Sequence, residues 1–178
     1  AKANSEVDAR LLEHCVREDL NAHAPRLMGV LRPLKLVIEN YPEGRREMLA
    51  AEDLPGGETT HEVPFSRELY IEQDDFMEEA PSKKYFRLAV GKEVRLKNAY
   101  IIKCERVEKD EAGNVVKVIC TYDPLSKSGD VNAGRKVKGT LHWVECQTAV
   151  PAEIRLYDYL LREDDAEGDF MERLNPNS

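Results

Sequence analysis

A run of basic side chains in the middle of the chain is the part of the sequence best suited to binding chemistry. The run "YFRLAVGKEVRLKNAYIIK" covers residues 85–103 and contains a single acid, Glu93. Its cations are Arg87, Lys92, Arg95, Lys97 and Lys103. The whole chain of 178 residues nevertheless has a formal net charge of -8. The contrast predicts a local basic surface on an acidic protein.

Alternation along this run indicates a strand that presents its cations on one face. Arg95 and Lys97 are two residues apart, so a strand would place them about 7 Å apart on the face opposite Val94 and Leu96. Arginine can donate two hydrogen bonds to a phosphate or a guanine edge, and a ring such as Phe86 can stack on an unpaired base. A solvated strand face whose cations discourage edge pairing fits the same pattern. The residues alone leave both interpretations open.

Motifs for catalysis or metal binding are missing from the sequence. It has no glycine-rich phosphate loop, no H-E-x-x-H and no G-x-S-x-G, and its four histidines are isolated. We therefore expect no catalytic centre, and we expect His142 and Trp143 to be structural. The cysteines form no C-x-x-C pair, which predicts free thiols at Cys15, Cys104, Cys120 and Cys146.

The composition is that of a soluble globular protein, with 42% hydrophobic and 34% charged residues. No apolar run approaches the roughly 18 residues of a membrane helix, and the first residues lack the apolar core of a signal peptide. We therefore expect a cytoplasmic protein.

The hydrophobic pattern predicts one helix followed by short strands. The helix is expected over residues 5–25, with Ser5 as its cap and Pro25 at its end. Strands are expected at 27–31, 34–41, 67–73, on both sides of a turn at 110–114 within 92–123, at 136–146 and at 152–161. Residues 42–63 and 125–135 read as exposed loops, 74–80 as a helical turn, and 162–178 as an acidic tail without an element. This order predicts a mainly β protein, an antiparallel barrel or sandwich with one leading helix.

Long runs of the sequence resemble the C-terminal region of the glutaminyl-tRNA synthetase family. They include "APRLMGVLRPLKLVIENYPEG", "VPFSRELYIEQDDF", "GKEVRLKNAYIIKCERVEKDEAGNV" and "KVKGTLHWV" followed by "PAEIRLYDYL". The resemblance extends from about Ala9 to Ser178. It implies β-barrels of a ribosomal-protein-like type that grip the tRNA anticodon.

The resemblance also implies roles for individual residues. Arg26 matches an arginine at the middle anticodon base, and Arg87 matches the arginine that reads guanine at the third position. Arg95 and Lys97 match two arginines around the first anticodon nucleotide and its phosphate. Asn21 matches an asparagine near the bases 3′ of the anticodon.

Three positions in or beside this set depart from the family pattern. Lys97 replaces an arginine. The substitution keeps the positive charge but loses the ability of a guanidinium to donate two parallel hydrogen bonds to one group. Lys84 and Phe86 stand where relatives carry glutamine and lysine, and we include both in the predicted tRNA-binding set.

The resemblance further implies how the chain is organised. Residues 1–25 would lead from a catalytic domain, and 26–178 would form the anticodon-binding region with one complete and one partial barrel. The HIGH and MSK signatures of the ATP site are absent, so ATP and Mg²⁺ are expected only in the parent glutamine–tRNA ligase. The expected partner is tRNA, with no DNA, no membrane and a monomeric state. Two alternatives remain: a glutamyl-tRNA synthetase of the same architecture, and a non-enzymatic ribosomal-protein-like RNA-binding barrel.

Overall fold

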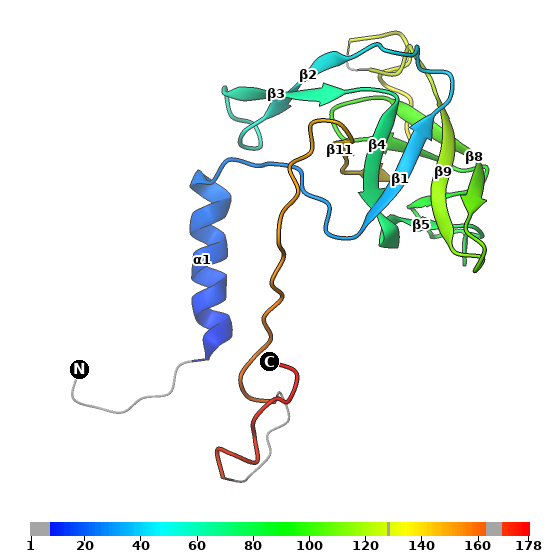
Figure 1. Cartoon of the computed structure of the whole chain (residues 1–178). Helices are drawn as coiled ribbons and strands as arrows, with labels where there is room; N and C mark the ends of the chain where they lie inside the picture. Colours follow the sequence, from blue (N-terminus) through cyan, green and yellow to red (C-terminus); the bar gives the residue numbers. More distant parts are fainter. Residues whose placement is uncertain (1–7, 128, 163–168) are drawn as a thin grey trace.

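The computed structural model describes residues 8–127, 129–162 and 169–178 (Figure 1). The α-helix of the described residues, α1 (Ala9–His23), stands beside a curled β-sheet, and the last part of the chain runs along the helix away from the sheet. The mainly β fold with one leading helix is confirmed.

Helix α1 begins and ends as its terminal residues dictate. The Asp8 side chain accepts a hydrogen bond from the Arg10 amide at 2.9 Å and so acts as the N-cap. The helix stops at Ala24, directly before Pro25, as expected. The predicted cap, Ser5, lies outside the described residues. No residue of α1 is buried, so its apolar stripe faces solvent.

Short strands make up the rest of the fold. They are β1 (Pro33–Ile38), β2 (Glu47–Glu52), β3 (Thr60–Phe65), β4 (Glu68–Glu72), β5 (Phe76–Met77), β6 (Leu88–Ala89), β7 (Glu93–Leu96), β8 (Ile101–Lys109), β9 (Val115–Tyr122), β10 (Thr140–Leu141) and β11 (Val144–Glu145). The main sheet has seven strands in the order β10-β7-β8-β9-β1-β4-β11. Most neighbours in it are antiparallel, whereas β1 with β9 and β10 with β7 are parallel.

One continuous segment joins the two edges of the main sheet. Leu141 of β10 pairs with Leu96 of β7 at one edge, and Val144 of β11 pairs with Tyr70 of β4 at the other. Only two residues separate β10 from β11, and one of them is Trp143, which is fully buried. The segment 140–145 therefore connects the sheet into a barrel, with the tryptophan inside it.

An aromatic cluster fills the barrel around this tryptophan. The Phe65 ring meets Trp143 edge-on at 5.1 Å and lies 5.3 Å from the rings of Tyr41 and Tyr100. Trp143 is thus a core residue, as predicted. The Glu47 carboxylate accepts hydrogen bonds from the Tyr41 and Tyr100 hydroxyls, both at 2.8 Å, which satisfies the polar ends of these rings.

The structure shows that three of the predicted elements were wrong. Residues 27–31 form no strand: Leu27 is 79% exposed, and the amides of Leu31 and Arg32 bond to the Glu72 carboxylate instead of a neighbouring strand. Residues 42–63 are not a plain loop, because they contain β2 and most of β3, joined by a turn in which Gly56 has a φ of 72°. Residues 152–161 form no strand and make only the Leu161–Leu174 bridge.

The region 92–123 contains three strands where the sequence predicts two. Asn98 takes a φ of 60° and turns the chain between β7 and β8, a conformation that asparagine tolerates better than most residues. The predicted turn between β8 and β9 is confirmed, with Gly113 at a φ of 86° and the Asp110 side chain accepting from the Asn114 amide at 2.8 Å.

Smaller differences concern two other segments. The helical turn expected at 74–80 is a 3-10 helix, η1 (Gln73–Asp75), followed by strand β5. The single strand expected at 136–146 is divided into β10 and β11. Of the cysteines, Cys104 and Cys120 are buried, Cys15 is exposed, and all four are free thiols as predicted.

Candidate nucleic-acid interface

Strand β7 presents its basic residues on the outer side of the barrel. Val94 and Leu96 are buried in the core, whereas Arg95 is half-buried and Lys97 is exposed. The alternation expected from the sequence is therefore confirmed for these four residues.

Arg95 and Lys97 are held in different ways. The Arg95 guanidinium donates to the carbonyl oxygens of Ser126 at 2.8 Å and Ala133 at 3.0 Å, so it ties down the loop that follows β9. Lys97 is fixed only through its backbone: its amide donates to Leu141 and its carbonyl accepts from the Trp143 indole at 3.0 Å. The Lys97 ammonium group pairs with no carboxylate among the residues that the structure describes.

The segment 84–87 packs against the residues just before β10. A Cβ atom on Gly139 would overlap the Phe86 carbonyl oxygen, so only glycine permits this approach. The Lys138 ammonium lies 5.2 Å from the centre of the Phe86 ring, which is 46% exposed. Lys138 is therefore a neighbour of the predicted site that the sequence reasoning missed, since its contact depends on the fold.

Arg87 is engaged by the short helix η1. Its Nη1 donates to the Asp74 carbonyl oxygen at 2.6 Å, and its Nε lies 3.4 Å from the Asp75 carboxylate. Arg87 itself remains exposed, and Asp75 is half-buried. The guanidinium is thus oriented by the protein and still open to solvent.

Asn21 and Arg26 lie together where the helix meets the linker to β1. The Arg26 guanidinium donates to the Asn21 side-chain oxygen at 3.2 Å, and the Arg26 amide donates to the Asp53 carbonyl at 2.8 Å. Both side chains are exposed. The structure thus brings this pair together, as it does the segment 84–87 and the Lys138–Gly139 pair.

The described lysines divide cleanly by ion pairing. Five of them form salt bridges with glutamates: Lys35, Lys103, Lys109, Lys117 and Lys127. The lysines with no such pair in the described part of the chain are Lys83, Lys84, Lys92, Lys97, Lys136 and Lys138. These six, called the unpaired lysines below, all lie in segments 83–97 and 136–138, which pack together through Phe86 and Gly139.

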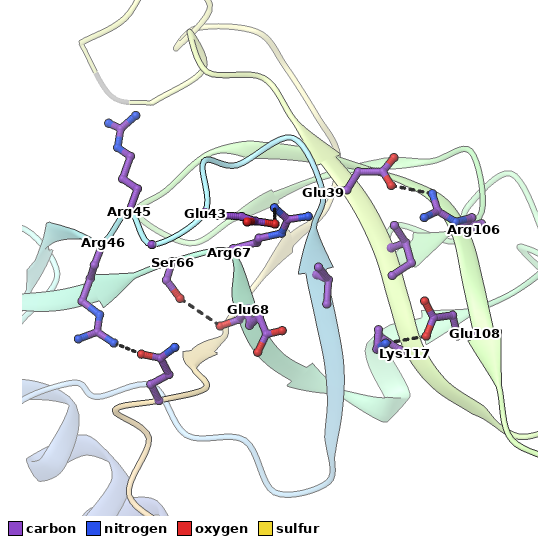
Figure 2. A pocket seen from close by; sticks show the side chains of 14 residues that line it. Glu39, Glu43, Arg45, Arg46, Ser66, Arg67, Glu68, Arg106, Glu108 and Lys117 are labelled. Atoms are coloured by element: carbon purple, nitrogen blue, oxygen red, sulfur yellow. Dashed lines mark hydrogen bonds and ion pairs between the residues drawn. The ribbon is translucent and has the colours of Figure 1, made fainter.

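A second charged surface, on the outer side of β1 and β9, is a weaker candidate for an anionic partner. It is a pocket of about 710 Å³ with Val37 and Ile119 among its lining residues (Figure 2). Three of its five lining cations are neutralised within the pocket, by the pairs Arg106–Glu39 at 2.7 Å, Arg67–Glu43 at 3.1 Å and Lys117–Glu108 at 2.6 Å. A phosphate would have to displace these carboxylates.

The described residues include no group of three or more histidine, cysteine or acidic side chains that could hold a metal ion. Within the same residues, no helix has the length and apolar character needed to cross a membrane.

The exposed Lys97 provides a test of whether this surface meets a polyanion. Replacing Lys97 with alanine should reduce the slope of log affinity against log salt by about one unit, for RNA of any sequence, because one phosphate contact is lost. Titrations of the chain with tRNA at several salt concentrations measure the slope. Lys109→Ala is the matched control, because Lys109 already pairs with Glu78 at 2.8 Å. Equal slopes in the two variants would make Lys97 part of an ordinary solvated face.

Comparisons with known proteins identify the family. The family described as class I tRNA synthetases (E and Q), anti-codon binding domain, matches residues 24–123, and a second family with the same description matches residues 140–178. The chain is 56% identical to a glutamine–tRNA ligase of Clostridium perfringens and 56% identical to one of Nitrobacter hamburgensis, in each case over 100% of the chain. It is 53% identical to that of Proteus mirabilis over 99% of the chain.

The match covers only part of these relatives. The chain spans 33% of the length of the Clostridium perfringens protein and 32% of the other two. The basic surface described above agrees with the function named for the matching region. The chain belongs to the family of anticodon-binding domains of the class I tRNA synthetases for glutamate and glutamine.

Proposed function

We propose that the chain recognises the anticodon of glutamine tRNAs on behalf of a glutamine–tRNA ligase. The observation that carries this proposal is the segregation of the unpaired lysines into segments 83–97 and 136–138, beside Arg87 and Phe86. Ammonium groups without carboxylate partners neutralise phosphates at little cost. An exposed arginine and an exposed ring suit the unpaired bases of an anticodon loop.

The predicted site residues take distinct roles in this proposal. Arg87 reads guanine at the third anticodon position, and Arg26, supported by Asn21, faces the middle base. Lys97 and Lys84 contact phosphates, and Phe86 offers a stacking surface. Because Arg95 already donates to two loop carbonyls, it acts at the first nucleotide mainly by fixing the loop 123–135.

The parent protein ligates glutamine to its tRNA with ATP and Mg²⁺, both held by a catalytic part outside this sequence. Residues 1–25 connect that part to the anticodon-binding region 26–178. The relatives named above are glutamine–tRNA ligases, which favours glutamine over glutamate as the amino acid. We further propose a monomeric, cytoplasmic protein whose partner is tRNA and not DNA.

Replacing Arg87 with alanine is the direct test of base reading. The guanidinium can donate two parallel hydrogen bonds to O6 and N7 of guanine, whereas adenine presents a donor at one of these positions. Arg87→Ala should therefore cost about 1–3 kcal/mol of discrimination between guanine and adenine at the third anticodon position.

Binding of two anticodon stem-loops, CUG and CUA, to the chain and to the variant forms a double-mutant cycle. A coupling energy near zero would mean that Arg87 acts only as a phosphate clamp or an ion-pair partner. Arg106→Ala is the control, because Arg106 pairs with Glu39 on the other charged surface. That variant should leave the preference for guanine unchanged.

A further inference from the structure

The surroundings of Arg87 differ from those of every unpaired lysine. Its Nε faces the Asp75 carboxylate at 3.4 Å, and its Nη1 donates to the Asp74 carbonyl at 2.6 Å. Asp75 has a side chain only 15% exposed, compared with 52% for Arg87. A fixed, half-buried carboxylate therefore stands behind a solvent-facing guanidinium.

The short helix that carries Asp75 is itself held in place. The carboxylate of Glu72, just before η1, accepts the amides of Leu31 at 2.6 Å and Arg32 at 3.0 Å. The Asp74 carboxylate forms an ion pair with Arg32. The same contacts dock the linker that carries Arg26, so Asp75 cannot swing away without disturbing several bonds.

This arrangement makes a phosphate an unfavourable partner for Arg87. Asp75 already offsets the charge of the guanidinium, and a phosphate brought to the same group would be repelled by the nearby carboxylate. A guanine edge carries no net charge and needs only hydrogen-bond donors. The hydrogen bond to the Asp74 carbonyl occupies one of the five N–H groups of arginine, and Asp75 faces Nε at 3.4 Å, which leaves the Nη2 side of the guanidinium for a base.

We propose that Asp75 is a positioning residue that determines specificity. It orients the Arg87 guanidinium toward the edge of a base and disfavours binding of a phosphate to Arg87. The unpaired lysines then supply affinity, and the Arg87–Asp75 pair supplies discrimination. This inference rests on the proposed function, because it assumes that Arg87 faces an anticodon base.

The test compares Asp75→Asn with Glu79→Gln in the full 178-residue chain. Both variants remove one negative charge, but Glu79 is exposed and has no ion-pair partner among the described residues. Binding of the CUG and CUA stem-loops is measured for each protein at several salt concentrations. A third variant, Asp75→Glu, keeps the negative charge on a side chain that is one methylene longer. Thermal unfolding of each variant confirms that it is folded.

Asp75→Asn should reduce the preference for CUG over CUA by about tenfold, mainly by tighter binding of CUA. It should also steepen the salt dependence by about 0.7 units, because Arg87 becomes free to bind a phosphate of the single-stranded loop. Glu79→Gln should change binding of both stem-loops alike and leave the slope unchanged. Asp75→Glu should recover part of the preference.

The outcomes separate this inference from the proposed function. If the unmodified chain prefers CUG and Asp75→Asn keeps that preference and slope, Asp75 is only a structural partner and the inference is overturned. If the unmodified chain binds both stem-loops equally, anticodon reading itself fails, and the inference fails with it.

Discussion

Replacing Trp143 with alanine should lower the free energy of unfolding by about 3–5 kcal/mol. The side chain is fully buried, meets Phe65 edge-on at 5.1 Å, and donates its indole hydrogen to the Lys97 carbonyl at 3.0 Å. It lies between β10 and β11, which pair with opposite edges of the main sheet. Alanine would leave a cavity at the point where the barrel is joined and would orphan a carbonyl acceptor.

Urea unfolding followed by far-UV circular dichroism measures this loss. Trp143→Phe should cost less, because the ring contact with Phe65 survives while the indole hydrogen bond does not. Val131→Ala, at a side chain 89% exposed, should change stability by no more than about 0.5 kcal/mol. A Trp143→Ala protein as stable as Val131→Ala would show that the segment 140–145 does not hold the barrel together.

The alternating pattern explains why part of the fold could be predicted from the sequence. In β7 and β8 strongly apolar residues such as Val94, Leu96 and Ile102 face the core, and polar residues intervene. The hairpin of β2 and β3 lacks this signal, since few of its side chains are buried and one of them is Ala51. At residues 152–161 the sequence instead predicts a strand that the structure lacks, because apolar side chains such as Leu156 remain exposed.

The candidate site was predictable in its residue types but not in its contacts. The sequence shows that Arg87, Arg95 and Lys97 are basic and lie on one strand-rich segment. It cannot show that Arg95 donates to the loop carbonyl of Ala133, or that Asp75 lies behind Arg87, because these contacts join residues far apart in the chain or across a turn. Such contacts depend on how the strands curl into a barrel.

Ion pairing explains how an acidic chain can carry a basic surface. Excess carboxylates elsewhere in the molecule pair with nearby lysines, as Glu68 does with Lys35 and Glu78 with Lys109. In segments 83–97 and 136–138 the lysines have no carboxylate partner among the described residues, and these segments adjoin one another at Gly139. The net charge of -8 then discourages RNA from binding to other faces of the protein.

Replacing Glu145 with alanine should lower the free energy of unfolding by about 3–5 kcal/mol, as much as removing the tryptophan, because several donors lose their common acceptor. Its fully buried carboxylate accepts the Ser66 hydroxyl at 2.7 Å, the amides of Gln147 at 3.0 Å and Thr148 at 2.8 Å, and the Thr148 hydroxyl at 2.7 Å. Arg46 lies 3.5 Å away and offsets its charge. Alanine would leave these donors without an acceptor at the turn where the chain leaves the barrel.

The protonation of Glu145 gives this prediction a second, pH-dependent part. Burial alone would raise the pKa of its carboxyl, but the hydrogen bonds from Ser66 and Thr148 outweigh burial and hold the pKa below the ordinary 4.5. The stabilisation is therefore complete above pH 4.5 and is lost as the pH falls through the lowered pKa of the folded state. Glu145→Gln keeps one acceptor oxygen and should lower the free energy of unfolding by about 1–2 kcal/mol near neutral pH. The difference in stability between this variant and the unmodified chain should become smaller as the pH falls.

Urea midpoints of the unmodified chain, Glu145→Ala and Glu145→Gln, measured from neutral pH down to about pH 3, test both parts. Glu153→Ala is the control, because it removes an acid 73% exposed that forms an ion pair with Arg155 on the surface. That control should differ from the unmodified chain by less than about 0.5 kcal/mol at neutral pH. If Glu145→Ala resembled Glu153→Ala, the buried carboxylate would contribute no net stability, and the turn at 145–149 would be held by its backbone alone.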